Sequence, residues 1–220
     1  MLAEQLIVEN IPPLSTSHTG ETALRWMDEF KVTHLSVVDD RKFLGTISES
    51  DVLGMADVGE AIGKYRELYN PTFVLQTQHI FEVVKVVNDH MLSIIPVLDS
   101  NETYLGSITI AQLMRIIAEM PVANHPGGII VIEMNTNDYS LQNITGIIEE
   151  NNVKILGTFI TSHPDSTKIQ LTIKVNETDI ASVISSLERH DYNVKWYGKN
   201  TDLDNDIRDR FDSLMKFLDL

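Results

Sequence analysis

One segment of the chain occurs twice, and this repeat constrains the fold more than any other feature. The segment HLSVVDDRKFLGTISESDVLGM begins at His34, and IIPVLDSNETYLGSITIAQLMRI begins at Ile94. Apolar residues at helical spacing predict an amphipathic helix before each copy, over residues 21–30 and 79–90. Each copy continues with two β runs and a closing helix, and short lead-in strands are possible near Pro12 and Thr72. Two such units bury each other's open sheet faces, so the repeat predicts a paired α/β domain.

A different pattern follows the stretch EMPVANHPGG, whose prolines and glycines mark a domain boundary. We expect the pair to cover residues 1–123, with repeat one at about 1–60, repeat two at about 61–123 and a linker at 124–127. Beyond the linker, a buried-type strand from Ile129 is followed by helix, two strands, helix and strand. This βαββαβ order predicts an α+β, ferredoxin-like domain over residues 128–198.

Residues 199–220 are predicted to form an acidic amphipathic C-terminal helix. Its apolar stripe packs either on its own domain or against a second subunit. The stripe consists of Ile207, Phe211, Leu214 and Leu218.

Composition excludes several classes of function. The net charge of −15 repels phosphate backbones and anionic lipid, so we expect no nucleic-acid partner. The N-terminus lacks the features of a signal peptide and no apolar run is long enough for a membrane span, so we expect a cytoplasmic protein that does not bind membranes. The absence of cysteine, the scattered histidines and the lack of nucleophile or phosphate-loop motifs indicate that the chain is not an enzyme, has no metal site and needs no cofactor.

The segments GTISESDV and GSITIAQL each join the end of a strand to the start of a helix. Ser48 with Asp51, and Thr109 with Gln112, fit the capping box, in which the fourth residue bonds back to the first. The same arrangement suits a nucleotide, because free amides at a helix start attract phosphate and a carboxylate accepts hydrogen bonds from ribose hydroxyls. Capping explains both copies, since Gln caps as well as Asp does. Capping does not require the charge of Asp51, so Asp51 is the better candidate for a ligand contact.

The doubled unit resembles the tandem cystathionine-β-synthase-type (CBS) pair, or Bateman module, in the phrases LSVVD with LGTISESDV and IPVLD with LGSITIAQL. The βαββαβ segment is similar to an ACT domain, on its element order and phrases such as NITGIIEENNVKILG. A CBS pair followed by an ACT domain resembles the acetoin-utilisation B type of bacterial regulatory protein.

The CBS resemblance implies an adenosine-type ligand between the repeats, with the motif hydroxyl on phosphate and the motif Asp on ribose. Ser48, Asp51 and Thr109 match that pattern, and Gln112 departs from it. His34 lies where related modules often carry a basic residue against phosphate, although an ordinary packed histidine fits as well.

These observations favour a regulatory protein that senses an adenosine nucleotide, AMP above all, and acts on an unidentified protein partner. The alternative is a ligand-independent scaffold with a degenerate CBS pocket. The ACT-like part lacks a glycine in the loop NTNDYS, so we expect an interaction element there, with amino-acid sensing as the lesser alternative. A homodimer is expected, because such modules commonly associate.

Overall fold

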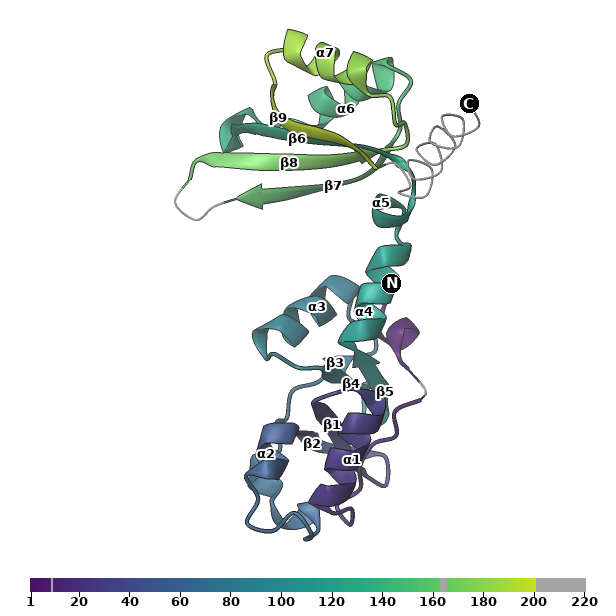
Figure 1. Ribbon diagram of the computed structural model, residues 1–220, viewed down its shortest axis with the longest axis vertical. Helices are drawn as coiled ribbons and strands as arrows, with labels where there is room; N and C mark the ends of the chain where they lie inside the picture. The colour runs from purple at the N-terminus through teal and green to yellow at the C-terminus, as the bar shows by residue number, and fades with distance from the viewer. Residues whose placement is uncertain (9, 163–165, 201–220) are drawn as a thin grey trace, which may run out of the picture. The chain divides into compact units, whose positions relative to one another are not determined.

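The computed structural model describes residues 1–8, 10–162 and 166–200, and the chain divides into two compact units, Met1–Ile117 and Ala118–Leu220. Figure 1 shows the elements of both units. In the described part of the chain, no helix is long and apolar enough to cross a membrane. Residues 201–220, where most of the C-terminal helix was predicted, lie outside the described residues.

Both repeats of unit 1 have the predicted order of helix, two strands and helix. Repeat one forms an antiparallel pair of strands, and repeat two forms a sheet in the order β3-β4-β5. The elements of repeat one are α1 (Gly20–Phe30), β1 (His34–Asp39), β2 (Lys42–Ser48) and α2 (Glu49–Leu53). The elements of repeat two are β3 (Val74–Leu75), α3 (Ile80–Asp89), β4 (Ile94–Leu98), β5 (Tyr104–Thr109) and α4 (Ile110–Glu119).

The two lead-in segments differ. The one before α3 becomes β3, which runs parallel to β4, whereas the one before α1 is reduced to a single parallel bridge between Leu14 and Val37. The first helix of repeat one illustrates the local signals, because the Thr19 side chain accepts a hydrogen bond from the Thr22 N–H and the helix ends at Lys31 in the left-handed conformation. Ala23 and Met27, one turn apart on α1, are buried against the strands.

Segments outside the two repeats pair with them. The N-terminal segment pairs with repeat two, and the linker between the repeats pairs with repeat one. The segment that contains the 3-10 helix η1 (Ala3–Leu6) pairs with repeat two, where Val8 bridges Ser107 and the Ala3 N–H donates to the Gln78 carbonyl. The linker contains η2 (Ile62–Lys64) and η3 (Arg66–Leu68), and it ends where Asn70 bridges Thr46 of repeat one.

Two matched glycines make this close packing possible. A Cβ on Gly45 would lie 2.6 Å from the Tyr69 Cβ, and one on Gly106 would clash with the Ile7 Cγ2. Both glycines have positive φ, of 149° and 155°, which other residues rarely adopt. The glycine that opens each repeated motif therefore admits the chain segment that covers its strand.

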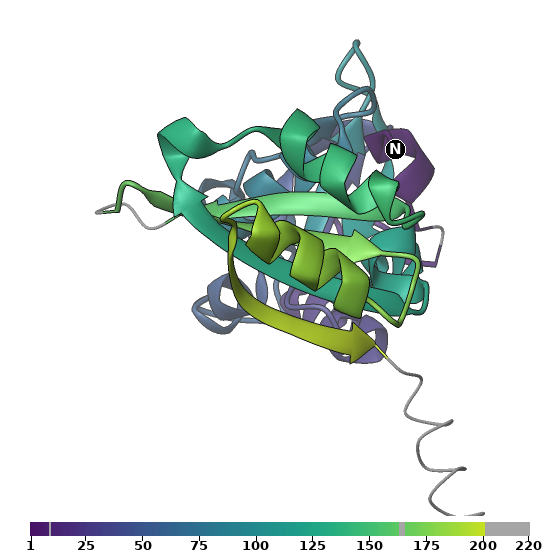
Figure 2. The ribbon, with the colours of Figure 1, turned by 90° about the horizontal axis from the view of Figure 1, so that it is seen from above.

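Unit 2 contains a four-stranded antiparallel sheet in the order β7-β8-β6-β9. Both helices of eight or more residues in its described part, α6 and α7, lie on one face of this sheet (Figures 1 and 2). Ile130, Ile132 and Met134 alternate along β6 toward that face and are buried, as period-two patterning requires. The elements are α5 (Pro121–Asn124), β6 (Gly127–Asn135), η4 (Thr136–Asp138), α6 (Leu141–Glu150), β7 (Ile155–Ser162), β8 (Lys168–Val175), α7 (Ala181–Arg189) and β9 (Asn193–Asn200).

The βαββαβ order predicted for this part of the chain is present. Its first strand begins at Gly127, two residues before the predicted Ile129, because the Gly128 N–H bonds to the Glu177 carbonyl and Gly127 pairs with β9. The short helix α5 ends at Asn124, the first residue of the predicted linker, and Pro121 occupies its first position, where proline lacks only an N–H that would be unpaired anyway.

Candidate functional site

The first repeated motif forms the predicted capping box. Ser48 ends β2, and its side-chain oxygen accepts a hydrogen bond from the Asp51 N–H at 3.1 Å. In return, Asp51 Oδ2 accepts from the Ser48 N–H at 3.2 Å and from the Ser48 hydroxyl at 2.5 Å. The carboxylate of Asp51 thus has a structural role in starting α2.

Capping engages only one oxygen of this carboxylate. Both bonds from Ser48 reach Oδ2, and none of the described residues donates a hydrogen bond to Oδ1 of Asp51. The hydroxyl of Ser50 lies 2.9 Å from that of Ser48, which gives the motif a pair of hydroxyls next to the carboxylate. Sequence reasoning missed Ser50, although a second serine within SESD was a visible signal.

The second motif is built differently. The Thr109 side-chain oxygen accepts from the Gln112 N–H at 3.0 Å, as in the first copy. The Gln112 amide oxygen, however, accepts from Arg115 Nε at 3.2 Å rather than from the strand end. The expectation that Gln112 caps as well as Asp51 is wrong, because its longer side chain reaches forward to the next turn of α4, where a guanidinium competes for it.

His34 lies at the junction between the repeats. It pairs with Ser48 across β1 and β2, and its Nδ1 accepts from the Ser93 N–H at 3.3 Å and lies 3.1 Å from the Ser93 hydroxyl. An Nδ1 that accepts is unprotonated, so the neutral ring carries its proton on Nε2. Burial lowers the pKa of His34, and the nearby Asp51 carboxylate only partly opposes this. The ring is therefore a neutral hydrogen-bonding group rather than a cation.

The same junction lies beside the start of the closing helix in both repeats. The Glu49 N–H donates to the Thr33 carbonyl at 2.9 Å, and the Ile110 N–H donates to the Ser93 carbonyl at 3.2 Å. The Thr33 N–H also donates to the Ser93 hydroxyl at 2.9 Å. These bonds connect the element that carries Ser48 and Asp51 with the element that carries Thr109 and Gln112.

A buried polar layer lies between the repeats. The hydroxyls of Ser36 and Ser107 are 3.0 Å apart, and the Tyr104 hydroxyl lies 2.8 Å from that of Ser107. Burial raises the pKa of Tyr104, so its hydroxyl stays protonated. The buried Thr46 hydroxyl has no partner among the described residues.

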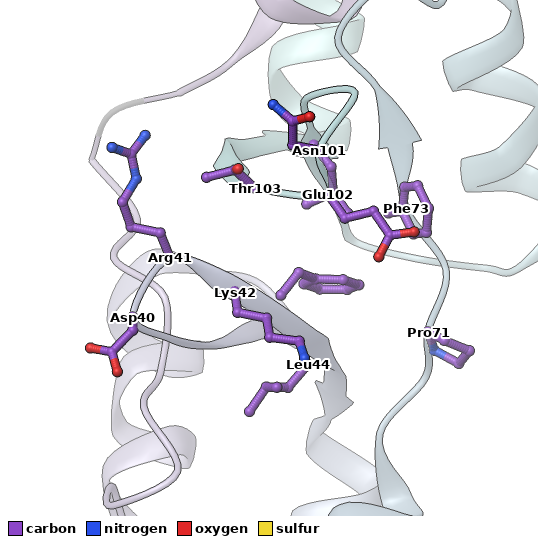
Figure 3. A pocket seen from close by; sticks show the side chains of 11 residues that line it. Asp40, Arg41, Lys42, Leu44, Pro71, Phe73, Asn101, Glu102 and Thr103 are labelled. Atoms are coloured by element: carbon purple, nitrogen blue, oxygen red, sulfur yellow. The ribbon is translucent and has the colours of Figure 1, made fainter.

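A cavity of about 580 Å³ lies at the opposite ends of the two strand pairs, and none of the five predicted site residues lines it. Lys42 and Glu102 extend from the two turns toward Pro71 and Phe73 (Figure 3). Its walls combine two acidic and two basic side chains with the rings of Phe43 and Phe73, whose centroids are 6.1 Å apart. This mixture of charges favours no particular ligand class.

Comparison with known proteins identifies the class. The family model described as "CBS domain" matches residues 66–119, which contain the whole of repeat two from β3 to α4. Repeat one has the same helix–strand–strand–helix order, so unit 1 has a mixed α/β CBS-pair fold that covers about half of the chain. The chain therefore contains a segment, residues 66–119, that matches the CBS domain family.

Three solved structures are similar to about half of the chain. A CBS domain pair/ACT domain protein from Thermotoga maritima has 19% identity and a TM-score of 0.48, over 54% of this chain and 98% of that one. The CBS-pair protein CBSX2 from Arabidopsis thaliana has 20% identity and a TM-score of 0.45, over 54% of this chain and 94% of that one. The cytosolic domain of the Mg²⁺ channel MgtE, in complex with ATP, has 21% identity and a TM-score of 0.43, over 52% of this chain and 48% of that one.

Proposed function

We propose that unit 1 binds an adenosine nucleotide with a single phosphate, such as AMP, at the motif of the first repeat. The observation that carries this proposal is the Oδ1 of Asp51, to which none of the described residues donates, beside the paired hydroxyls of Ser48 and Ser50. A carboxylate oxygen accepts a ribose hydroxyl in a charge-assisted bond worth roughly 1.5 to 3 kcal/mol. Capping fixes Asp51 before any ligand arrives, so little side-chain entropy is lost on binding.

The phosphate contacts of this site rest on hydroxyls more than on charge. Helix α2 has only five residues, so its aligned dipoles add little, and His34 is neutral. The single hydroxyl proton of Ser48 goes to Asp51 Oδ2, so Ser50 is the hydroxyl that can donate to one phosphate, whereas a triphosphate would meet the field of a chain with a net charge of −15. These features favour AMP over ATP.

The second repeat should contribute a weaker site or none. The Gln112 amide is neutral and already bonded to Arg115, so a ribose must displace that bond to reach it. Thr109 is buried and has its oxygen engaged by the Gln112 N–H. We infer one nucleotide for each chain.

We further infer that the protein is regulatory and acts on a partner protein through unit 2, which we interpret as an ACT-like interaction element. Binding between repeats shifts the balance between two arrangements of unit 1, and about 1 to 3 kcal/mol of coupling is enough for regulation. The turn that follows β6, η4, contains no glycine that would let a ligand approach its backbone.

A ligand-independent scaffold is the competing function. It is favoured by the structural uses of the candidate residues, since Asp51 caps α2 and His34 bonds to Ser93. The two functions differ in whether any small molecule stabilises the fold.

A thermal-shift panel of AMP, ADP, ATP, NAD and S-adenosylmethionine separates them. A ligand at 100 times its dissociation constant stabilises the folded state by about 2.7 kcal/mol, and we expect AMP to give the largest shift. Asp51→Asn should abolish the AMP shift, whereas Gln112→Ala and the cavity variant Lys42→Ala should retain it. If no compound moves the transition, or if Gln112→Ala and Asp51→Asn lose the shift equally, the nucleotide proposal fails.

A further inference from the structure

The sheet of unit 2 has α6 and α7 on one face, and we call the opposite face the open face (Figures 1 and 2). A row of side chains crosses it from one edge strand to the other. Thr172 of β8 pairs with both Phe159 of β7 and Val131 of β6, and Val131 also pairs with Trp196 of β9. Residues paired across strands lie on the same face, so the row ends in two aromatic rings, each 53% exposed.

One end of the open face is already covered by a helix. Gly157 pairs with Lys174 next to the row, and a Cβ added to Gly157 would lie 3.0 Å from the Val122 Cγ2 of α5. The Trp196 ring lies over Gly198, where an added Cβ would meet the indole at 2.5 Å. These glycines let side chains lie flat on the sheet, as they do where another element packs closely against a strand.

The strand positions of the open face are basic, although the chain is acidic. Lys168 and Lys195 both form ion pairs with Glu133 Oε1, at 3.1 and 3.3 Å, so one carboxylate serves two ammonium groups. Lys174 is 2% exposed, and the Gly127 carbonyl, at 2.9 Å, is the one acceptor that the described residues offer its amine. Burial disfavours the charged amine and lowers the pKa of Lys174. A carboxylate beside this amine would offset that cost.

The described part of the chain ends next to this amine. Asn200, the last residue of β9, pairs with Gly127, whose carbonyl accepts the hydrogen bond from Lys174. The sequence continues with TDLDND, in which three of the six residues are aspartate. An acidic segment therefore starts where the open face has a buried ammonium group.

The apolar stripe predicted beyond this acidic segment fits the row in length. A helix from Ile207 to Leu218 is about 17 Å long, and four strands spaced about 4.8 Å apart carry a row of about 14 Å. Residues 201–206 span up to about 20 Å when extended, which is enough to bring the stripe back over the sheet. A helix of about 12 residues is marginal in water by itself, so it needs an apolar surface to form.

We propose that residues 207–218 form a helix that lies on the open face of the same chain, with its apolar stripe on the row. The aspartates of residues 201–206 then lie toward Lys174. A second copy and a foreign protein are the other possible occupants. A connection of six residues favours the chain's own segment, because it gives an effective concentration in the roughly millimolar range. A second copy with a net charge of −15 is repelled instead.

The test is the accessibility of Trp196 in the full-length chain. In a Trp26→Phe background Trp196 is the remaining tryptophan, and acrylamide quenching of its fluorescence measures how much of the indole is covered. We expect Phe211→Asp, which places a charge within the stripe, to raise the quenching constant roughly twofold, because the row loses its cover. Ser213→Asp is the matched control, since it adds the same charge on the opposite side of the predicted helix and should leave quenching unchanged.

A second pair of variants tests the sheet. Phe159→Ser removes one end of the row and should also raise the quenching constant. Ile160→Ser changes the next residue of β7, which faces the other side of the sheet, and should not. Circular dichroism shows whether each variant keeps its fold. Equal quenching of the Trp26→Phe protein with and without Phe211→Asp overturns the proposal, and so does an equal change in Phe211→Asp and Ser213→Asp.

A mixing experiment separates the chain's own segment from that of a second copy. The reporter carries Trp26→Phe and Phe211→Asp, so its open face lacks a working stripe. It is mixed with an excess of a chain that carries Trp26→Phe and Trp196→Phe, which has an intact stripe and no tryptophan. We expect no change in quenching of the reporter. Renewed protection of its Trp196 would show that the open face binds the segment of another chain, and would overturn the proposal.

Discussion

The hydroxyl of Ser36 in β1 lies 3.0 Å from the hydroxyl of Ser107 in β5, so the two repeats share a hydrogen bond that is fully buried. The Tyr104 hydroxyl joins the same oxygen of Ser107. Polar groups at the centre of an otherwise apolar interface fix its register, because any slip leaves them without partners.

Removing the shared hydroxyl should therefore be costly. We expect Ser107→Ala to lower the free energy of unfolding by about 1 to 3 kcal/mol, because both Ser36 and Tyr104 lose a buried partner. The double variant Ser36→Ala with Ser107→Ala should cost less than the two single changes added together. Urea unfolding in a Trp196→Phe background, where Trp26 is the remaining tryptophan, measures unit 1 alone. A change within 0.5 kcal/mol for Ser107→Ala would contradict this account.

The stability of unit 1 should depend on pH through His34. Burial holds the folded pKa of His34 below its ordinary value of 6.5, so the unfolded chain binds more protons between the two values. The stability that neutral His34 contributes is fully present above about pH 6.5 and is lost as pH falls through the folded pKa. The free energy of unfolding then falls by at most about 1.4 kcal/mol per pH unit.

The control for this prediction is His34→Gln, which keeps an acceptor for the Ser93 N–H and does not titrate. Unfolding of the wild type and of the variant is measured by urea from pH 5 to 7.5, again through Trp26. The wild type should lose stability relative to the variant toward the acid end. Parallel curves over the whole range would show that His34 is not the source.

The two capping arrangements predict different costs for removing their fourth residue. Asp51→Ala should destabilise unit 1 by about 1 kcal/mol, since the Ser48 N–H and hydroxyl lose their acceptor. Gln112→Ala should be neutral or slightly stabilising, because it gives up one exposed bond to Arg115 and gains helix propensity. Equal losses in the two variants, measured by urea unfolding without ligand, would contradict the difference between the motifs.

Two glycines should respond in opposite directions to the same change. Gly146 lies inside α6 with open space where a Cβ would be added, so Gly146→Ala should stabilise unit 2 by about 0.5 to 1 kcal/mol. Gly45→Ala should destabilise unit 1 by about 1 to 3 kcal/mol, because its φ is positive and the new Cβ meets Tyr69. Scanning calorimetry checks both, and a loss of stability in Gly146→Ala would contradict the open space found beside Gly146.

Local sequence patterns predicted the helices and strands well. They did not predict the side-chain partners that depend on contacts between distant segments. Helical spacing in HIFEVVKVVNDH placed α3 within a residue at each end, because burial follows this period directly. The capping of α2 by Ser48 and Asp51 was also readable, since it involves residues three apart.

The bond from Ser93 to His34 was not readable, because it joins residues 59 apart whose meeting depends on how the repeats pack. Gln112 shows a second limit. The sequence allows its side chain to bond either to the backbone of Thr109 or to Arg115, and only the structure shows that it bonds to Arg115 while its N–H bonds to the Thr109 hydroxyl.

The pairing of Val8 with Ser107 places the first segment of unit 1 on repeat two. The chain enters the unit on repeat two and leaves it through α4, also in repeat two, so repeat one is in effect an insertion within its twin. A pull on residues 1–8 and on the end of α4 would load repeat two and bypass repeat one. The half that carries Asp51 is thus sheltered from a force that acts on the two ends of the unit.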